Sequence, residues 1–491
     1  MQQVVINASG IEKRTALLKD GKLIECAYQR PDEKPSAGSI YKGRVQKVLP
    51  GMQAVFVDIG TDKNGFLHKD DLPGFQPLSD EEKKQISISN LVKEGESILV
   101  QIVKEETGEK GAKLTALLSF TGHLLVYFPF TPHIGVSKKI KESARESLNK
   151  WGKENTSGQE GLIIRTGCED FPEIEMEKEL NALRKQLSNV QKKADEKKAP
   201  SLLIRPAFYQ TYLEKWLNQH VEEIIVDDHE IYHQIKEYVS VLNKPYSVKL
   251  YKERDPIFNK FGIDTEIRKS LSPHVWLKNG SSLYINVTEA LTVIDVNTGK
   301  FTGKKDRAKT IVETNLLAAE EIMKQLRLRN LAGMIVIDFI TMSSNNDKQM
   351  IMSALQKEMR NDAATMMLHG FTKMGLFEMT RKKERPTLLE TLTVKPHGDV
   401  MDGHRIRSET HFYELERLAI EHMYHDDEAF WIEGPAYFYD WINKHQDKLT
   451  EIEEKYGKKL FVSKGDSNRE ITLRKTGTID EIKARICKDT H

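Results

Sequence analysis

Two apolar segments, each carrying one aspartate near its end, constrain the fold of this chain more than any other feature. They are LTVIDVNTGKFTGKK at 291–305 and AGMIVIDFITM at 332–342, and their aspartates are Asp295 and Asp338. The residues between them, from about 308 to 330, have the length and pattern of a helix. A strand, a helix and a second strand in this order predict a parallel crossover unit in an α/β fold.

In such a unit both strands run the same way, so both carboxylates are expected at one edge of the sheet, where α/β folds bind ligands. Asn297 follows Asp295 by two residues and shares its face of the strand. Two carboxylates at one place repel each other, and Mg²⁺ held by carboxylates, water and a substrate phosphate would offset that repulsion. The alternative is that each aspartate only ends its strand as a cap or turn residue. A sugar-phosphate backbone could approach closely along the neighbouring glycines and lysines, Gly299, Lys300, Gly303, Lys304 and Lys305.

Composition excludes several other classes of protein. The chain has 491 residues with 74 Lys and Arg against 73 Asp and Glu, so any basic surface must be local. The three cysteines, Cys26, Cys168 and Cys487, lie far apart, which excludes a disulfide framework and a CxxC zinc site. The N-terminus lacks the apolar segment of a signal peptide, and no apolar run approaches the ~18 residues of a membrane helix. We therefore expect a cytoplasmic protein without a membrane segment.

The first 120 residues have the pattern of β-structure. An Asp20-Gly21 turn between two alternating runs, 15–19 and 22–28, predicts a hairpin, and 3–8 predicts a strand before it. This unit is too small to fold alone, so it is expected to pair with strands from elsewhere in the chain. Residues 36–120 contain five short strands separated by glycine-containing turns, which suggests an OB-type barrel. Phe56 and Phe66 in this segment either stack on bases or pack in the barrel core.

The remaining segments alternate between helix and strand patterns. GLIIRTG at 161–167 predicts a strand ending in Arg-Thr-Gly, and a long amphipathic helix follows through Leu180–Ala194. Further predicted elements are strands at 221–226 and 246–250 with a helix at 230–242 between them, helices near 412–424 and 436–456, and strands at 459–463 and 470–473.

Three stretches together resemble the catalytic domain of the ribonuclease E/G family: EALTVIDVNTGKFTG, ETNLLAAEEIMKQLRLRNLAGMIVIDFITM and GLFEMTRKK. The resemblance extends from residue 1 to about 390 and is most specific over 288–342. It implies a multidomain α/β chain. The implied domains are an RNase-H-like unit split between 1–35 and 211–278, an OB barrel at 36–120, a 5′-phosphate sensor domain at 121–210, a DNase-I-like catalytic domain at 279–395 and a small α+β C-terminal module at 396–491.

The resemblance also implies roles for single residues. Asp295 and Asp338 match the pair that holds a catalytic Mg²⁺, and Asn297 matches the supporting amide. The implied RNA-binding residues of the barrel are Phe56, Phe66 and Lys110. The implied residues of the 5′-monophosphate sensor are Gly122, Val126, Arg165 and Thr166, and a guanidinium beside a hydroxyl is suited to phosphate.

The sequence departs from the family pattern at two places. Thr365 stands where the family has a second sensor arginine, which leaves 5′-end selectivity open, although Arg360 is nearby. The cysteines of the family's CPxC zinc link are absent, so any homo-oligomer would form without that link. The long scaffold tail of the larger members is also missing, so the chain resembles the short, G-type members.

The function implied is a Mg²⁺-dependent endoribonuclease that cuts single-stranded RNA, such as rRNA precursors and mRNA, to 5′-phosphate and 3′-hydroxyl ends. The alternative is a non-catalytic RNA-binding or ribosome-associated scaffold that uses the barrel. A third interpretation, an α/β nucleotide-binding protein, lacks the glycine-rich turn that it needs. Weaker candidates are Asp227-Asp228-His229, which reads as a turn, and the histidines at 397, 404, 411, 422 and 425, which lack a compact metal-ligand spacing.

Overall fold

The computed structural model describes residues 1–31, 37–106, 110–138, 140–217, 221–240, 246–298, 307–383, 385–395, 404–423, 425–465 and 470–489. The chain is a multidomain α/β protein that divides into two compact units. One contains 1–30, 215–235 and 246–491, and the other contains 31–214 and 236–245. Within the described residues, no helix combines the length and the apolar character needed to cross a bilayer.

The three N-terminal strands join a sheet whose other two strands come from about 200 residues later in the chain. The sheet has the order β15-β14-β1-β2-β3. β1 pairs antiparallel with β2 and parallel with β14, which confirms the prediction that the N-terminal unit pairs with distant strands. The elements are β1 (Gln2–Asn7), β2 (Lys13–Lys19), β3 (Lys22–Gln29), α4 (Phe208–Trp216), β14 (Val221–Val226), α5 (His229–Ser240), β15 (Ser247–Leu250), α6 (Ile257–Lys260) and α7 (Ile263–Ser270).

The two predicted aspartate strands lie in a six-stranded sheet with the order β16-β17-β18-β19-β21-β20. β18 and β19 are parallel neighbours joined by a long helix, as the crossover prediction requires. The elements are β16 (His274–Trp276), β17 (Ser282–Val287), β18 (Leu291–Asn297), α8 (Arg307–Leu328), β19 (Gly333–Asp338), α9 (Asn345–Met359), β20 (Met366–Phe371) and β21 (Phe377–Arg381).

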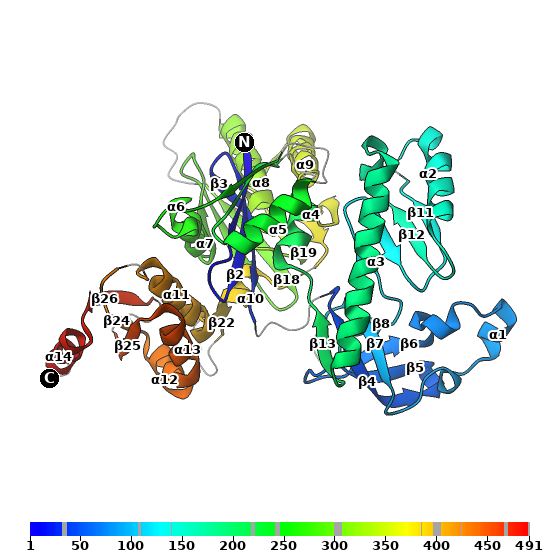
Figure 1. Cartoon of the computed structure of the whole chain (residues 1–491). Helices are drawn as coiled ribbons and strands as arrows, with labels where there is room; N and C mark the ends of the chain where they lie inside the picture. The colour runs from blue at the N-terminus through cyan, green and yellow to red at the C-terminus, as the bar shows by residue number, and fades with distance from the viewer. Residues whose placement is uncertain are drawn as a thin grey trace. The chain divides into compact units, whose positions relative to one another are not determined.

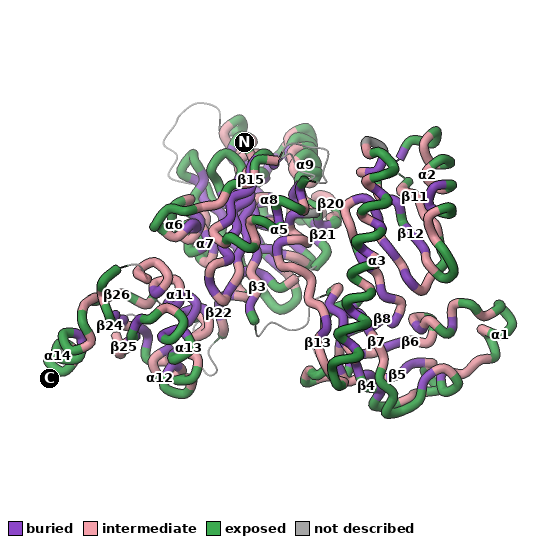
Figure 2. Tube along the Cα trace, in the orientation of Figure 1, coloured by how far each residue is buried: buried purple, intermediate pink, exposed green. Residues whose placement is uncertain are grey.

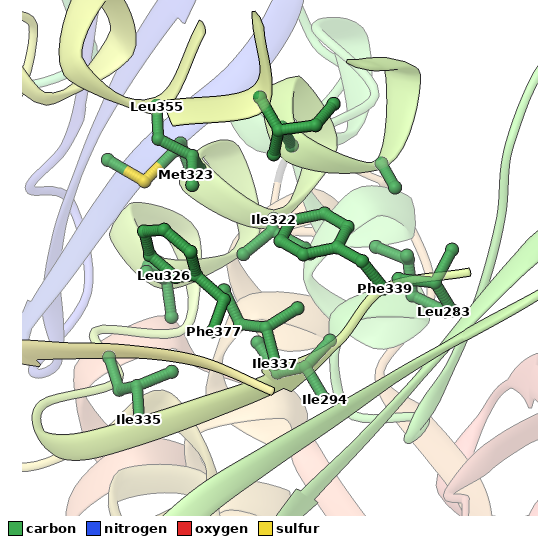
Figure 3. Packing of buried hydrophobic residues seen from close by; sticks show 14 of the residues in the cluster. Leu283, Ile294, Ile322, Met323, Leu326, Ile335, Ile337, Phe339, Leu355 and Phe377 are labelled. Atoms are coloured by element: carbon green, nitrogen blue, oxygen red, sulfur yellow. The ribbon is translucent and has the colours of Figure 1, made fainter. Parts of the chain in front are cut away.

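One face of this sheet is covered by α8 and α9 (Figure 3). Ile322 and Leu326 of α8 and Leu355 of α9 are fully buried in the same apolar cluster as the strands. From the strands, Ile294, Ile335, Ile337 and Phe377 enter that cluster. Burying each such side chain contributes about 1.5–3 kcal/mol, so this packing fixes which face of the sheet points inward.

The second unit contains a closed five-stranded barrel. Its strands follow the order β4-β5-β6-β8-β7, and β7 pairs back with β4 to close it. The five strands predicted for this segment are therefore confirmed as a barrel. The elements are β4 (Ile40–Leu49), β5 (Ala54–Asp58), β6 (Gly65–His68), α1 (Asp80–Gln85), β7 (Ser97–Lys104) and β8 (Lys113–Thr115), and β13 (Ser201–Ile204) adds to β4.

A four-stranded sheet with the order β11-β12-β10-β9 lies in the same unit. The predicted amphipathic helix, α3, buries Met176, Leu180, Leu183 and Val190 in the apolar cluster of this sheet. Along α3 in Figure 2, buried residues recur between exposed ones, so the helix packs on its own sheet and is not a coiled-coil arm. The elements are β9 (Phe120–Thr121), β10 (Leu125–Phe128), β11 (Ile134–Val136), α2 (Glu142–Asn155), β12 (Gly161–Ile164) and α3 (Glu173–Glu196).

The C-terminal residues form a small α+β module around a sheet with the order β25-β24-β26 (Figure 1). One prediction was wrong here, because the helix expected over 436–456 is two helices that meet at His445. The elements from 388 onward are α10 (Leu388–Leu392), β22 (Thr393–Val394), β23 (Arg405–Ile406), α11 (Ser408–Glu421), β24 (Ala429–Gly434), α12 (Ala436–Lys444), α13 (Gln446–Tyr456), β25 (Lys459–Lys464), β26 (Thr472–Gly477) and α14 (Ile479–Asp489).

Candidate active site

Asp295 and Asp338 occupy directly opposed positions on adjacent parallel strands. Neighbouring strands are about 4.8 Å apart, and opposed residues project from the same face of a sheet. Ile294 and Ile337, which precede the two aspartates, point into the core. The pleat therefore directs both carboxylates to the face that α8 and α9 leave open, so the structure brings this predicted pair together.

Asn297 lies on the same open face and orients one of the carboxylates. Its Nδ2 donates a 2.7 Å hydrogen bond to Oδ2 of Asp295. Asp295 is partly exposed, and Asp338 and Asn297 are exposed. Solvent reaches both carboxylates, and it screens part of the repulsion between them.

The donor set at this position suits Mg²⁺. That ion is usually held by one or two carboxylates, with water and substrate phosphate completing an octahedron. Among the described residues, no three His, Cys, Asp or Glu side chains lie together as a metal cage. An exposed pair of carboxylates leaves room for water and phosphate. The glycines and lysines predicted to admit the RNA backbone, at 299, 300, 303, 304 and 305, lie outside the described residues.

Asn315 is a positioning residue that the sequence did not reveal. It lies in the middle of α8 and is fully buried. Its Nδ2 donates to the carbonyl of Ile340 at 2.8 Å, and its Oδ1 accepts from the amide of Ile340 at 3.1 Å. These bonds tie the helix to the chain two residues beyond Asp338. The signal in the sequence was a polar residue on the apolar side of an amphipathic helix, which needs a hydrogen-bond partner when it is buried.

On the barrel, Phe56 and Phe66 are opposed residues of β5 and β6. Their ring centroids are 6.1 Å apart in an edge-to-face arrangement. Both rings are partly exposed, whereas Val55, Val57 and Leu67 fill the barrel interior. Of the two interpretations left open by the sequence, the core position is therefore wrong, and the rings lie on the outer surface of the barrel.

Two lysines that the sequence did not single out extend this pair into a cross-strand row. Lys47 of β4 is opposed to Phe56, and Lys113 of β8 is opposed to Phe66. Both lysines are exposed, as is the predicted residue Lys110. Aromatic rings flanked by cations can bind the bases and phosphates of a single strand. Only the strand register reveals these lysines, which are far apart in sequence.

Of the predicted sensor residues, Gly122 lies directly after β9, Val126 lies within β10, and Arg165 and Thr166 follow β12. Arg165, directly after β12, donates from Nη1 to the carbonyl of Gly122 at 2.6 Å. The hydroxyl of Thr166 lies 3.0 Å from that of Ser137. Val126 is in the middle of the sheet, opposed to Ile163. The structure thus joins Arg165 to Gly122 directly, and it places Thr166 and Val126 on neighbouring segments.

Gly122 is required by its surroundings. A Cβ at this position would lie 1.9 Å from Oε1 of Glu179. That carboxylate accepts hydrogen bonds from the amides of Leu124 and Leu125. Glu179 therefore fixes the turn between β9 and β10, and it brings a negative charge close to the predicted phosphate pocket.

The other candidates have structural partners. Asp227 is partly buried and accepts hydrogen bonds from Asn7 and from the amide of Ala8, so it holds a turn, as predicted. Its partial burial raises its pKa. His411 bonds to Glu414 and Tyr437 inside the C-terminal module. His397 lies outside the described residues. Thr365 precedes β20, where its carbonyl accepts from the amide of Lys382, and Arg360 is exposed after α9.

Comparisons with known proteins match this chain to a single family over nearly its whole length. The model of the ribonuclease E/G family matches residues 119–384. The chain is 36% identical to ribonuclease G of Escherichia coli K12, over 94% of this chain and 96% of that protein. It is 35% identical to ribonuclease G of Haemophilus influenzae over the same shares. It is 37% identical to ribonuclease E of a Nostoc species over 72% of this chain and 52% of that protein.

Proposed function

Because the chain belongs to the ribonuclease E/G family, we propose that it is a Mg²⁺-dependent endoribonuclease that hydrolyses single-stranded RNA. The observation that carries the proposal is the opposed pair of carboxylates on β18 and β19, with an amide holding one of them. Paired carboxylates on an open sheet face give an ion access to both solvent and a phosphodiester.

The chemistry is an in-line displacement at phosphorus. A bound Mg²⁺ would lower the pKa of a water molecule and offset the charge that develops on the phosphate oxygens. The water oxygen bonds to phosphorus while the bond to the 3′ oxygen breaks, and the 3′ oxygen takes a proton. The products are a 5′-phosphate and a 3′-hydroxyl. Asp295 and Asp338 would hold the ion, and Asn297 keeps Asp295 in one orientation.

The second unit supplies RNA recognition in this proposal. The barrel would act as an OB-type module in which Phe56 and Phe66 stack on bases and Lys110 contacts phosphate. Lys47 and Lys113 extend this surface to both sides of the rings. Arg165 and Thr166, with Gly122 and Val126, would form the pocket for a 5′-monophosphate.

The substrates proposed are rRNA precursors and mRNA in the cytoplasm, and the domain names implied by the family (RNase-H-like, OB, sensor and DNase-I-like) are part of the same proposal. The competing function is a non-catalytic RNA-binding or ribosome-associated scaffold. The two functions differ in one assay. An endoribonuclease cleaves a fluorescent single-stranded oligonucleotide with Mg²⁺ and stops when EDTA is added, whereas a scaffold binds the oligonucleotide with or without EDTA and leaves it intact.

The assay should use matched oligonucleotides with a 5′-monophosphate or a 5′-hydroxyl. Faster cleavage of the monophosphorylated strand would support the sensor assignment even though Thr365 replaces the family arginine. Equal rates would remove the sensor from the proposal and leave the nuclease assignment intact. The absence of Mg²⁺-dependent cleavage on both strands would overturn the nuclease assignment.

A further inference from the structure

A row of side chains crosses four strands of the catalytic sheet on its open face. His274 of β16 is opposed to Tyr284 of β17, and Tyr284 is opposed to Asp295 of β18. Asp295 is in turn opposed to Asp338 of β19. Trp276 follows His274 by two residues and therefore projects from the same face. The aromatic residues thus lie in line with the proposed metal ligands.

The aromatic side chains are unusually accessible. Trp276 is 72% exposed and Tyr284 is 45% exposed. The rings of His274 and Trp276 contact each other edge to face, with centroids 4.4 Å apart. Cross-strand ring contacts add a little to sheet stability, but a tryptophan this exposed contributes little through burial. The residues that hold these strands to the core, Val275 and Leu283, point the other way.

The position of these rings suits the bases next to the bond being cut. Tyr284 lies one strand, about 4.8 Å, from Asp295, and β16 lies one strand further, at about 10 Å. A nucleotide adjacent to a phosphate held between the two aspartates would reach them. Every base has a π-face, and stacking on an aromatic ring is worth about 1–3 kcal/mol whatever the sequence.

Two exposed charges near the aspartates favour the same path for the RNA, from the aspartates toward β16. Lys278 is exposed two residues after Trp276, beyond the end of β16. On the other side of the aspartates, β21 presents the exposed Glu378 in the row next to theirs, opposed to Val336 of β19. Of these two charges, Lys278 would attract a negatively charged strand that leaves the carboxylates, and Glu378 would repel it.

We propose that Tyr284 and Trp276 form a base-stacking subsite that positions the nucleotides flanking the scissile phosphate of single-stranded RNA. The proposal rests on the proposed nuclease function, and it makes these two residues positioning residues. The subsite predicts that the bases near the cut must be unpaired, because a base in a duplex cannot offer its face to a ring.

The test pairs changes in the protein with changes in the RNA. A cleavage site is first mapped on a defined oligonucleotide. Oligonucleotides with one abasic residue at each position around that site are then cleaved by the wild type, by Trp276→Ala and by Tyr284→Ala. We expect abasic substitution at one or two positions to raise the wild-type KM by about tenfold. Each alanine variant should raise the KM for intact RNA by a similar factor. In that variant, removing the base that stacks on the missing ring should change KM little further. Trp276→Phe should restore most of the wild-type KM.

The matched control is Met367→Ala on β20. Met367 is 61% exposed on the same face, in the row of Met334 and Thr380, away from the aspartates. Its KM should equal the wild-type value. The proposal would be overturned if the increases in KM from the alanine change and the abasic change were additive. It would also be overturned if KM were unchanged in both alanine variants.

A binding measurement keeps this proposal separate from the nuclease assignment. Trp276 is the most exposed of the five tryptophans, since Trp151, Trp216 and Trp431 are buried and Trp441 packs in the C-terminal core. In Asp338→Asn, single-stranded RNA should quench tryptophan fluorescence, and Trp276→Phe should remove most of that quenching. If the protein cleaves RNA but this quenching is absent, the subsite is wrong. If quenching occurs without cleavage in the wild type, the nuclease assignment is wrong, and the two rings bind RNA without positioning a bond to be cut.

Discussion

Asn315 and Ile340 are joined by two hydrogen bonds, so the middle of α8 holds the backbone just beyond Asp338. The helix and the segment that follows the strand are therefore joined directly. This link connects the apolar packing under the sheet to the carboxylate above it, because Asn315 is fully buried in the layer that covers the strands.

Replacing Asn315 with Leu should destabilise the protein and slow RNA cleavage. The change leaves the amide and carbonyl of Ile340 without their partners, which costs about 1–3 kcal/mol in free energy of unfolding. Urea denaturation measures the first effect, and kcat at saturating RNA measures the second. Glu320→Ala, on the exposed side of the same helix, is the control and should change stability by less than about 0.5 kcal/mol. Equal stability of both variants would contradict the structural role of Asn315.

Glu25 should make stability depend on pH in the acidic range. Burial alone would raise the pKa of this carboxyl, but Lys215, Arg385 and Arg327 together hold it below its ordinary value. A lowered folded-state pKa stabilises the fold above the unfolded pKa, and the contribution is lost as pH falls through the folded value.

The variant Glu25→Gln leaves Lys215 and Arg385 beside a neutral side chain. At pH 7 it should lower the free energy of unfolding by about 3 kcal/mol. The difference from the wild type should shrink as pH falls below about 4.5. Denaturant titrations between pH 3 and 8 check this, with Glu289→Gln, an exposed carboxyl, as the control. A difference that stays constant over this range would contradict the proposed ion pairs.

The aromatic row on the barrel should contribute to RNA affinity and not to folding. Phe66→Ala should weaken binding of a single-stranded oligonucleotide by about tenfold, with a small change in Tm, because the ring is only partly buried. Lys113→Ala should lower the slope of log affinity against log salt by about 1. Val103→Ala, at an exposed position of β7, is the control. Wild-type affinity in Phe66→Ala would exclude this surface as an RNA site.

Arg165 should decide whether the 5′ end of the RNA is recognised. Arg165→Lys keeps the charge but loses the planar fork that binds phosphate through two nitrogens. We expect any preference for a 5′-monophosphate to fall toward equal rates, while cleavage of the 5′-hydroxyl strand is unchanged. Lys150→Ala, on the exposed side of α2, is the control. A preference that persists in Arg165→Lys would place the phosphate pocket elsewhere.

The sequence predicted those parts of the fold that depend on local pattern. Asp20-Gly21 marked the first hairpin, and the two aspartate strands with their helix marked the crossover unit. β24 escaped prediction because helices cover both of its faces, so its residues, such as Phe430 and Trp431, do not alternate with polar ones. The break at His445 was missed because the apolar pattern continues across it.

The candidate site was predictable where one strand or one crossover defines it. Asp295, Asn297 and Asp338 needed only the period of a strand and the direction of a parallel pair. Lys47, Lys113, Tyr284 and Trp276 depend on which strands become neighbours and in which register, and a single sequence does not contain that information. The outward position of Phe56 and Phe66 depends in the same way on how the barrel closes.

The most direct test of the central claim is the rate of Mg²⁺-dependent RNA cleavage by Asp295→Asn and Asp338→Asn. Each substitution removes a charge that would hold the ion and keeps the shape of the side chain. Both variants should lose at least about 100-fold in kcat, a loss on the scale of removing one electrostatic contact to the transition state. Their RNA affinity and Tm should be retained. Glu289→Gln, an exposed carboxyl in the turn between β17 and β18, should cleave at the wild-type rate. Wild-type cleavage rates in both asparagine variants would contradict the assignment of this pair as the catalytic centre.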